Sequence, residues 1–292
     1  MYSAIAANKR NTVIIMAVFI GVVAAVGWAI SAAYGNTYIT PWIIGGAGVY
    51  ALIQYYAADK LAVAMTGAQQ IEKRDNPRLW RIVENLAITN GMPMPRVYIV
   101  DDPAPNAFAT GRDPDHALVA ATTGILDIMN DRELEGVMAH EMGHVKNYDI
   151  RVSMIAFGLA SAIGILSDIA LRMMLFGGDR DSRESNPIMM IAGIVVIILA
   201  PIVAALIQAA ISRQREYLAD ATGALTTRDP EGLASALEKL KTHTRPMQKQ
   251  STVTAHLFFA NPLKSGTLMN LFSTHPPLDD RIARLQEQLT KM

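Results

Sequence analysis

The 292-residue chain lacks cysteine and lacks net charge. Without cysteine it forms no disulfides and offers no thiolate ligands to zinc, and this absence suits a site in the reducing cytoplasm. Its 26 basic residues balance 26 acidic ones, so the composition indicates neither nucleic acid nor acidic substrates as partners. Apolar residues, in contrast, make up 51% of the chain and gather in long blocks.

Residues 11–58 contain no charged side chain. A turn at residues 34–38 divides them into two apolar stretches of about 20 residues, each long enough to cross a bilayer. Trp28 and Trp42 flank the turn, where aromatic rings would lie at the level of the lipid headgroups. We expect a transmembrane hairpin rather than a hairpin in a soluble core or a cleaved signal peptide, because signal sequences carry one apolar stretch of about 7–15 residues.

Positive residues around this hairpin predict its orientation. Lys9 and Arg10 precede the first apolar stretch, whereas the turn carries no charge. Lys60, Lys73 and Arg74 follow the second stretch. Because positive side chains beside membrane spans favour the cytoplasmic side, we expect the N-terminus and the segment after the hairpin to face the cytoplasm.

Two further apolar stretches predict a second hairpin. Residues 185–212 are uncharged and long enough to span. Residues 152–176 contain Asp168 and Arg172, an i,i+4 pair that is costly in lipid unless it is paired or lies at an interface. We expect these two side chains to extend to the outer boundary of the membrane. The alternative is that they line a polar path for substrate.

Residues 140–144 read His-Glu-Met-Gly-His, the pattern of zinc hydrolases. On a helix, His140 and His144 lie one turn apart and can bind one metal, while Glu141 points to the open side of that metal. A water activated there can attack a peptide carbonyl, with Glu141 taking its proton and passing it to the departing amine. The spacing therefore predicts zinc-dependent peptide hydrolysis, against the alternative of an accidental match on a surface helix.

The residues before this motif predict the helix that it requires. Asp131 is the expected N-cap, and Glu133 and Glu135 lie in the first turns, where acidic side chains are favourable. The motif is therefore expected to lie on a helix.

The third zinc ligand is expected on a separate helix. Glu216 and Asp220 lie four residues apart, on one face of a segment of good helix formers. Glu216 is the predicted metal ligand, and Asp220 is expected to accept a hydrogen bond from the second ring nitrogen of a metal-bound histidine. The alternative is an exposed helix on which Arg213 and Arg215 balance the two acids.

A small sheet is expected before the zinc helix. Residues 95–100 and 116–121 have the pattern of short strands, with residues 106–110 between them. The edge of such a strand can bind an extended substrate backbone, and a plain edge strand or loop is an equally good interpretation. The candidate substrate-binding residues are Asn106, Ala107, Phe108 and Ala109.

The His-Glu-Met-Gly-His motif at residues 140–144 and the segment 216–220, which contains Glu216 and Asp220, together resemble the HtpX-type membrane metallopeptidases. These are relatives of the CAAX prenyl proteases in the gluzincin class. Residues 106–111, Asn-Ala-Phe-Ala-Thr-Gly, and residues 274–277, Thr-His-Pro-Pro, match the same family. The resemblance implies one bound zinc per chain and a zinc metalloendopeptidase acting on misfolded or membrane proteins. It also implies envelope quality control, a stress response, at the bacterial inner membrane.

The resemblance also draws attention to His275 and Arg281. His275 precedes two prolines at the start of an amphipathic helix, and it is a candidate donor to the developing oxyanion. Arg281 is a candidate for the same role or for binding substrate. Turn capping is the structural alternative for His275.

We therefore expect a mainly helical α+β integral membrane protein, multi-pass with about four transmembrane helices, whose gluzincin-like catalytic domain and active site face the cytoplasm. A processing protease for lipidated proteins is one alternative, although four spans are few for the large chamber of the CAAX proteases. A non-catalytic membrane adaptor with structural zinc is another, and it would be indifferent to Glu141. Residues 1–60 are predicted to form an N-terminal hairpin, and residues 61–151 the first part of the catalytic domain. Residues 152–211 are predicted to form an inserted hairpin, and residues 212–292 the second part of the catalytic domain.

Overall fold

The computed structural model describes most of the chain outside the second predicted hairpin. His275, Asp168 and Arg172 lie outside the described residues. The described residues are 2–33, 38, 40–156, 158–160, 162–163, 213–243, 245–248, 257–260 and 276–289.

The chain forms two compact units. One comprises Met1–Asn8, Ala58–Met154 and Ile211–Met292, and the other comprises Lys9–Ala57 and Ile155–Ala210. The first unit contains the sheet and joins segments that are far apart in the sequence. It is the unit in which the candidate site residues lie.

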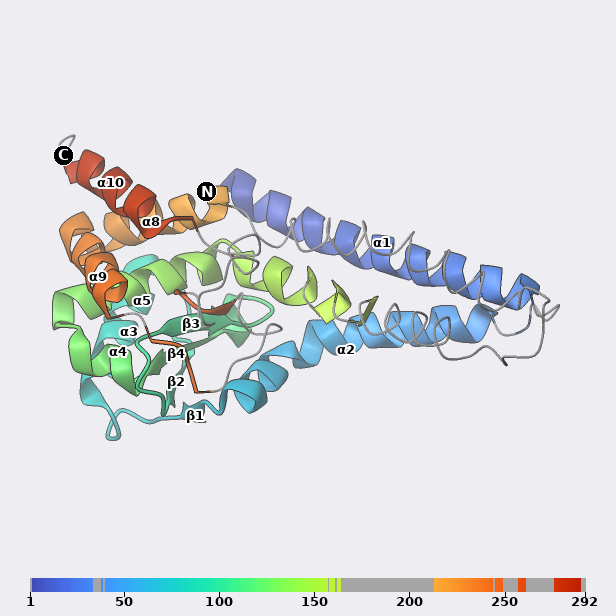
Figure 1. The fold of residues 1–292 in the computed structure, drawn as a ribbon, viewed down its shortest axis with the longest axis horizontal. Coiled ribbons are helices and arrows are strands. Elements are labelled where there is room, and N and C mark those ends of the chain that lie inside the picture. Colours follow the sequence, from blue (N-terminus) through green and yellow to red (C-terminus); the bar gives the residue numbers. More distant parts are fainter. Residues whose placement is uncertain are drawn as a thin grey trace, which may run out of the picture. The chain divides into compact units, whose positions relative to one another are not determined.

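Two long helices open the chain, α1 (Tyr2–Ala33) and α2 (Thr40–Thr66), both drawn in blue in Figure 1. Within α1, Ile5–Trp28 is long and apolar enough to cross a membrane, and no other described helix meets that standard. The second predicted span is helical in α2 but less apolar. Of the third predicted span, residues 152–156, 158–160 and 162–163 are described and are helical, whereas the fourth lies outside the described ranges.

The sheet has four strands in the order β1-β2-β4-β3. The central strands β2 (Arg96–Val100) and β4 (Leu118–Thr122) pair in parallel, and both were predicted to within two residues. The edge strands β1 (Gln69–Gln70) and β3 (Ala107–Thr110) pair antiparallel to them. β4 begins later than expected because the side chain of Asp113 caps a short 3-10 turn by accepting a hydrogen bond from the His116 backbone.

Helix α5 (Asp131–Lys146) carries the His-Glu-Met-Gly-His motif, as predicted. Its N-cap is Asn130 and not Asp131, which is the first helical residue. The Asn130 side chain accepts a hydrogen bond from the Glu133 backbone at 3.0 Å, and the Glu133 carboxylate accepts one from the Asn130 backbone at 2.8 Å. This reciprocal capping box selects Asn130 over its neighbour.

The core of the first unit is built around α5, which lies between the sheet and the helices α8 (Arg213–Thr227) and α9 (Pro230–Thr242) (Figure 1). Helix α3 (Pro77–Asn90) also packs against α5, while the short α4 (Thr123–Ile128) follows β4. Buried apolar side chains from α5 and its neighbours fill the interior, among them Leu79, Val83, Val119, Ile125, Leu134, Val137, Met138, Met142, Leu233 and Leu237.

Glycines allow α5 to approach its neighbours closely. A Cβ on Gly223 of α8 would lie 3.0 Å from the His140 backbone nitrogen, and one on Gly136 of α5 would lie 2.9 Å from Leu233 Cα. These distances are too short for an ordinary side chain. The contact at Gly223 brings α8 against the turn of α5 that carries the first histidine of the motif.

The last described helix, α10 (Leu278–Leu289), packs against α9 and α8. Its apolar face buries Ile282 and Leu285, as its amphipathic pattern predicted. The same helix buries the side chain of Arg281, whose exposed fraction is 0%. A charged group in such a position requires partners, and these lie in the candidate site.

Candidate metal centre

Three predicted ligands meet on two adjacent helices. His140 and His144 lie one turn apart on α5, with their Nε2 atoms 3.1 Å from each other. Glu216, on α8, places its carboxylate oxygens 3.8 Å from His140 Nε2 and 3.4 Å from His144 Nε2. The ligating atoms of all three residues lie within 4.8 Å of one another.

This donor set fits zinc. Zinc binds imidazole nitrogen and carboxylate oxygen at about 2.0–2.2 Å in tetrahedral geometry, which separates two ligand atoms by roughly 3.3 Å. The three separations here are 3.1, 3.4 and 3.8 Å. Two imidazoles and one carboxylate also leave a fourth position for water or substrate, as in catalytic zinc sites.

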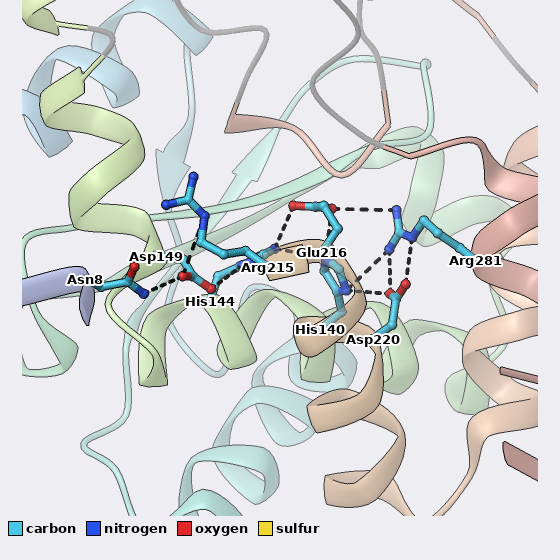
Figure 2. A network of polar contacts seen from close by, with 8 residues as sticks. All are labelled: Asn8, His140, His144, Asp149, Arg215, Glu216, Asp220 and Arg281. Atoms are coloured by element: carbon cyan, nitrogen blue, oxygen red, sulfur yellow. Dashed lines mark hydrogen bonds and ion pairs between the residues drawn. The ribbon is translucent and has the colours of Figure 1, made fainter. Parts of the chain in front are cut away.

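In each of the two histidines, Nε2 faces the other ligands and Nδ1 contacts a carboxylate (Figure 2). Asp220 Oδ1 lies 2.8 Å from His140 Nδ1, the arrangement predicted for that carboxylate. Asp149 Oδ2 lies 3.1 Å from His144 Nδ1. An imidazole that donates from Nδ1 to a carboxylate keeps the lone pair of Nε2 for a metal. Both rings are therefore oriented for one ion.

Arg281 lies beside Asp220, and its Nη2 is 3.3 Å from His140 Nδ1 (Figure 2). Its Nε and Nη2 donate to the two Asp220 oxygens at 2.9 and 2.7 Å. Its Nη1 is 3.9 Å from Glu216 Oε2 and makes no hydrogen bond with the part of the chain that the structure describes. The guanidinium also stacks over Phe259, with 4.7 Å between the guanidinium carbon and the ring centroid.

The surroundings shift the pKa values of the two histidines in opposite directions. Burial lowers the pKa of His140 to about 4, although the hydrogen bond to Asp220 acts against it. Burial also acts to lower the pKa of His144, but the carboxylates of Glu216 and Asp149 outweigh it and raise the pKa well above 6.5. Burial alone would raise the pKa of Asp220, but Arg281 and His140 hold it at about 2. Asp220 is therefore an ionised partner of His140.

Glu141 is buried on α5, with an exposed fraction of 3%. Burial acts to lower the pKa of Arg281, but the charges of Asp220, Glu216 and Glu141 raise it above its usual value. Glu141 thus lies within electrostatic reach of Arg281. A carboxylate next to the ligand cluster is what proton transfer from a bound water requires.

The predicted substrate-binding residues lie at the start of β3, and the chain itself covers their outer edge. The Asn106 amide donates to Ala260 O at 2.8 Å and accepts from Ala260 N at 2.9 Å. Phe259 N donates to Ala107 O at 2.8 Å, and Phe108 pairs with Phe258. Substrate binding at this edge stays a prediction, and it requires the segment 257–260 to move.

That same segment reaches the metal ligands. The Phe259 ring lies edge-on to His140, with their ring centroids 4.9 Å apart. β3 and the candidate metal centre are thus linked through one aromatic side chain. Sequence reasoning missed Phe259, because nothing in its local pattern distinguishes it from other apolar residues.

Sequence reasoning also missed Asp149 and its partner Asn8. Asp149 follows His144 by five residues, a spacing that does not align them on one helix. They meet because α5 ends at Lys146 and a turn at residues 147–148 leads into the helical segment that begins at Asp149; Tyr148 in this turn has a φ of 62°, in the left-handed region. Such a conformation is rare for a residue with a large side chain, so no propensity argument predicts it.

Known proteins resemble this chain over almost its whole length. Residues 73–289 match Peptidase family M48. A "Protease HtpX homolog" of Tropheryma whipplei (strain TW08/27) is 57% identical over 288 residues, covering 98% of each protein. Another, from Lactobacillus helveticus (strain DPC 4571), is 45% identical over 300 residues, covering 98% of this chain and 99% of that protein. Among solved structures, S. mikatae Ste24p has a similar fold, with a TM-score of 0.55 at 19% identity, over 93% of this chain and 62% of the other.

Proposed function

The chain belongs to peptidase family M48 and is a metalloprotease of the HtpX type, and from this premise we propose that it uses one zinc ion held by His140, His144 and Glu216. The observation that carries this proposal is the grouping of their ligating atoms within 4.8 Å. The Asp220 and Asp149 contacts to the far ring nitrogens support it, because metal-bound histidines usually have such partners.

The residues around the ligands support hydrolysis of peptide bonds. When bound, zinc would polarise the substrate carbonyl and make a water more acidic. Glu141 would accept the proton of the attacking water and then donate it to the departing amine nitrogen. Its burial beside the ligands favours this transfer over exchange with bulk solvent.

Arg281 acts mainly through Asp220 in this proposal. Two of its nitrogens are committed to the Asp220 carboxylate, which in turn holds His140. Only Nη1 remains to meet a substrate oxygen, and it is nearest to Glu216. His275 remains the other candidate for stabilising the oxyanion.

Substrate proteins would bind as extended strands. The outer edge of β3 is the proposed surface, with Asn106 through Ala109 offering backbone groups that any sequence can pair with. Because Phe259 pairs there with Ala107 in this structure, a substrate would replace the segment 257–260. Binding through backbone groups suits an enzyme that acts on many unfolded proteins.

We place the enzyme in the bacterial inner membrane, where it removes misfolded or membrane proteins as part of quality control. The apolar helix Ile5–Trp28 and the curated relatives support the membrane setting. The basic residues around the first hairpin support a cytoplasmic active site. The proposed organisation has two membrane hairpins and a catalytic domain divided between residues 61–151 and 212–292.

A processing protease for lipidated substrates is the alternative enzyme. The membership in M48 fits both kinds of protease, so the substrate spectrum separates them. The non-catalytic adaptor is disfavoured, because the chain is a metalloprotease.

The decisive experiment compares wild type with Glu141→Gln at equal, measured zinc content, using the full chain in detergent and an unfolded, fluorescently labelled protein as substrate. We expect the variant to bind zinc and to lose cleavage by at least about a hundredfold, the usual contribution of a general base. Glu135→Gln on the same helix is the matched control and should cleave normally. Equal cleavage by Glu141→Gln would overturn the proposed mechanism.

A further inference from the structure

A buried polar chain connects helix α1 to the candidate metal centre. Asn8, on α1, donates both hydrogens of its amide: one to Asp149 Oδ1 at 2.6 Å and one to the Asn147 backbone oxygen at 2.8 Å. The other Asp149 oxygen lies on His144 Nδ1 (Figure 2). Asn8 and Asp149 are 141 positions apart in sequence yet share one buried contact.

The backbone between His144 and Asp149 is shaped for this contact. Asn147 ends α5, and Tyr148 adopts a left-handed conformation that residues other than glycine and asparagine rarely take. This turn places the Asp149 carboxylate against Nδ1 of His144, and not against the ligand nitrogen Nε2. Disfavoured backbone conformations persist where the surrounding structure requires them, often at functional sites.

The burial of Asp149 makes the contact with Asn8 energetically important. Asp149 is 3% exposed and Asn8 is 5% exposed, so both polar groups are withdrawn from water. A buried carboxylate needs hydrogen bonds and positive charge. His144 and Asn8 supply hydrogen bonds, and Arg215 Nε lies 3.9 Å from Asp149 Oδ1. Asn8 is therefore one of few partners that fix the rotamer of this carboxylate.

We propose that Asp149 is a positioning residue for His144 and that Asn8, on the first helix, holds Asp149 in place. The inference rests on the proposed metal site. It means that the beginning of α1 contributes to metal binding, in addition to the part of α1 that is apolar enough to cross a membrane. Loss of Asn8 would leave His144 present but free to turn away from the ligand position.

The test measures zinc affinity of the full chain in detergent, by competition with a chromophoric chelator, together with the unfolding temperature of the metal-free protein. We expect Asp149→Ala to weaken zinc binding about 10- to 100-fold, as is usual when the partner of a metal-bound histidine is removed. Asp149→Asn should lose less, because its amide oxygen can still accept from His144 Nδ1. Asn8→Ala should lose several-fold, and the double variant should be no weaker than Asp149→Ala alone.

Asn11→Ala is the matched control, an asparagine one turn further along α1. It should leave zinc affinity unchanged. A purely structural role for Asn8 or Asp149 would lower the unfolding temperature of the metal-free protein without changing zinc affinity, and this result would overturn the inference.

His144→Ala separates this inference from the proposed site. If it loses zinc while Asp149→Ala and Asn8→Ala bind as tightly as wild type, only the positioning role fails. If His144→Ala itself binds zinc as tightly as wild type, the proposed metal site fails, and the positioning role fails with it.

Discussion

Arg281 and Asp220 form a fully buried, two-point ion pair, with donor to acceptor distances of 2.9 and 2.7 Å. The pair joins α10 to α8, and its Asp220 carboxylate places a negative charge next to His140. Because the partner of a buried charge cannot be removed without leaving that charge unpaired, the pair links the stability of the fold to the geometry of the metal centre.

We predict that Arg281→Met destabilises the protein by about 3–5 kcal/mol, since it leaves Asp220 buried without its cation. Arg281→Lys keeps the charge but lacks the two-pronged geometry, so it should be intermediate and should weaken zinc binding. Unfolding in denaturant and zinc titration measure the two effects. Arg284→Met on the same helix removes a stacking contact with Tyr217 and should cost about 1 kcal/mol or less.

We predict that Gly223→Ala separates α8 from α5. The added Cβ would meet the His140 backbone nitrogen at 3.0 Å, so the helices must shift, at a cost of about 1–3 kcal/mol. The shift moves Glu216 away from the histidines and should weaken zinc binding. Gly45→Ala, where nothing lies within 4 Å of the added atom, is the control. Unchanged zinc affinity in Gly223→Ala would show that the close approach does not set the ligand geometry.

Asn106→Ala should loosen the segment 257–260 from β3. It removes two hydrogen bonds to Ala260, each with a net value of about 0.5–1.5 kcal/mol. If substrate strands compete for this edge, KM should fall while kcat changes little, and steady-state cleavage assays measure both. Asn85→Ala, an exposed position on α3, is the control. A raised KM would instead indicate that Asn106 binds substrate directly.

Glu133 should make stability depend on pH. Burial acts to raise its pKa, but hydrogen bonds from Lys239, Asn130 and Ser235 outweigh this and lower the pKa below 4.5. Because the folded-state pKa is the lower one, ionised Glu133 stabilises the fold above about pH 4.5, and this contribution is lost as the pH falls through the folded-state value.

Thermal unfolding of Glu133→Gln and wild type between pH 7 and acidic pH tests this expectation. The variant should unfold at a lower temperature at pH 7, and the difference should shrink as the pH falls below about 4.5 and through the lower folded-state pKa of Glu133. Glu238→Gln, at an exposed position of α9, serves as the comparison and should match wild type throughout. A difference that stays constant with pH would show that the charge of Glu133 does not matter.

Sequence periodicity predicted the local elements of the fold. α5 and α10 carry their apolar residues at helical spacing, and β2 and β4 are short apolar runs, so each could be recognised from neighbouring residues. The N-cap of α5 was misplaced by one residue because asparagine and aspartate both cap helices well. The spacing from Asn130 to Glu133 holds the information that decides between them.

The residues of the candidate site likewise fall into two groups, those that could be predicted from the sequence and those that could not. His140, Glu141, His144 and the pair on α8 follow from chemistry at fixed helical spacing. Asp149, Asn8 and Phe259 do not, because each reaches the site through a turn with a left-handed residue or through a contact between distant segments. A left-handed tyrosine and a segment that covers a strand about 150 positions earlier are properties of the folded chain and leave no periodic trace in sequence.

The wide separation of Asn8, His140 and Arg281 along the chain has a consequence for biosynthesis. Arg281 is synthesised 141 codons after His140. Until then Asp220 has no cation, and the helix with the two histidines lacks its final support. The metal centre therefore cannot take its final form until Arg281 has been made, so the order of synthesis delays assembly of the site.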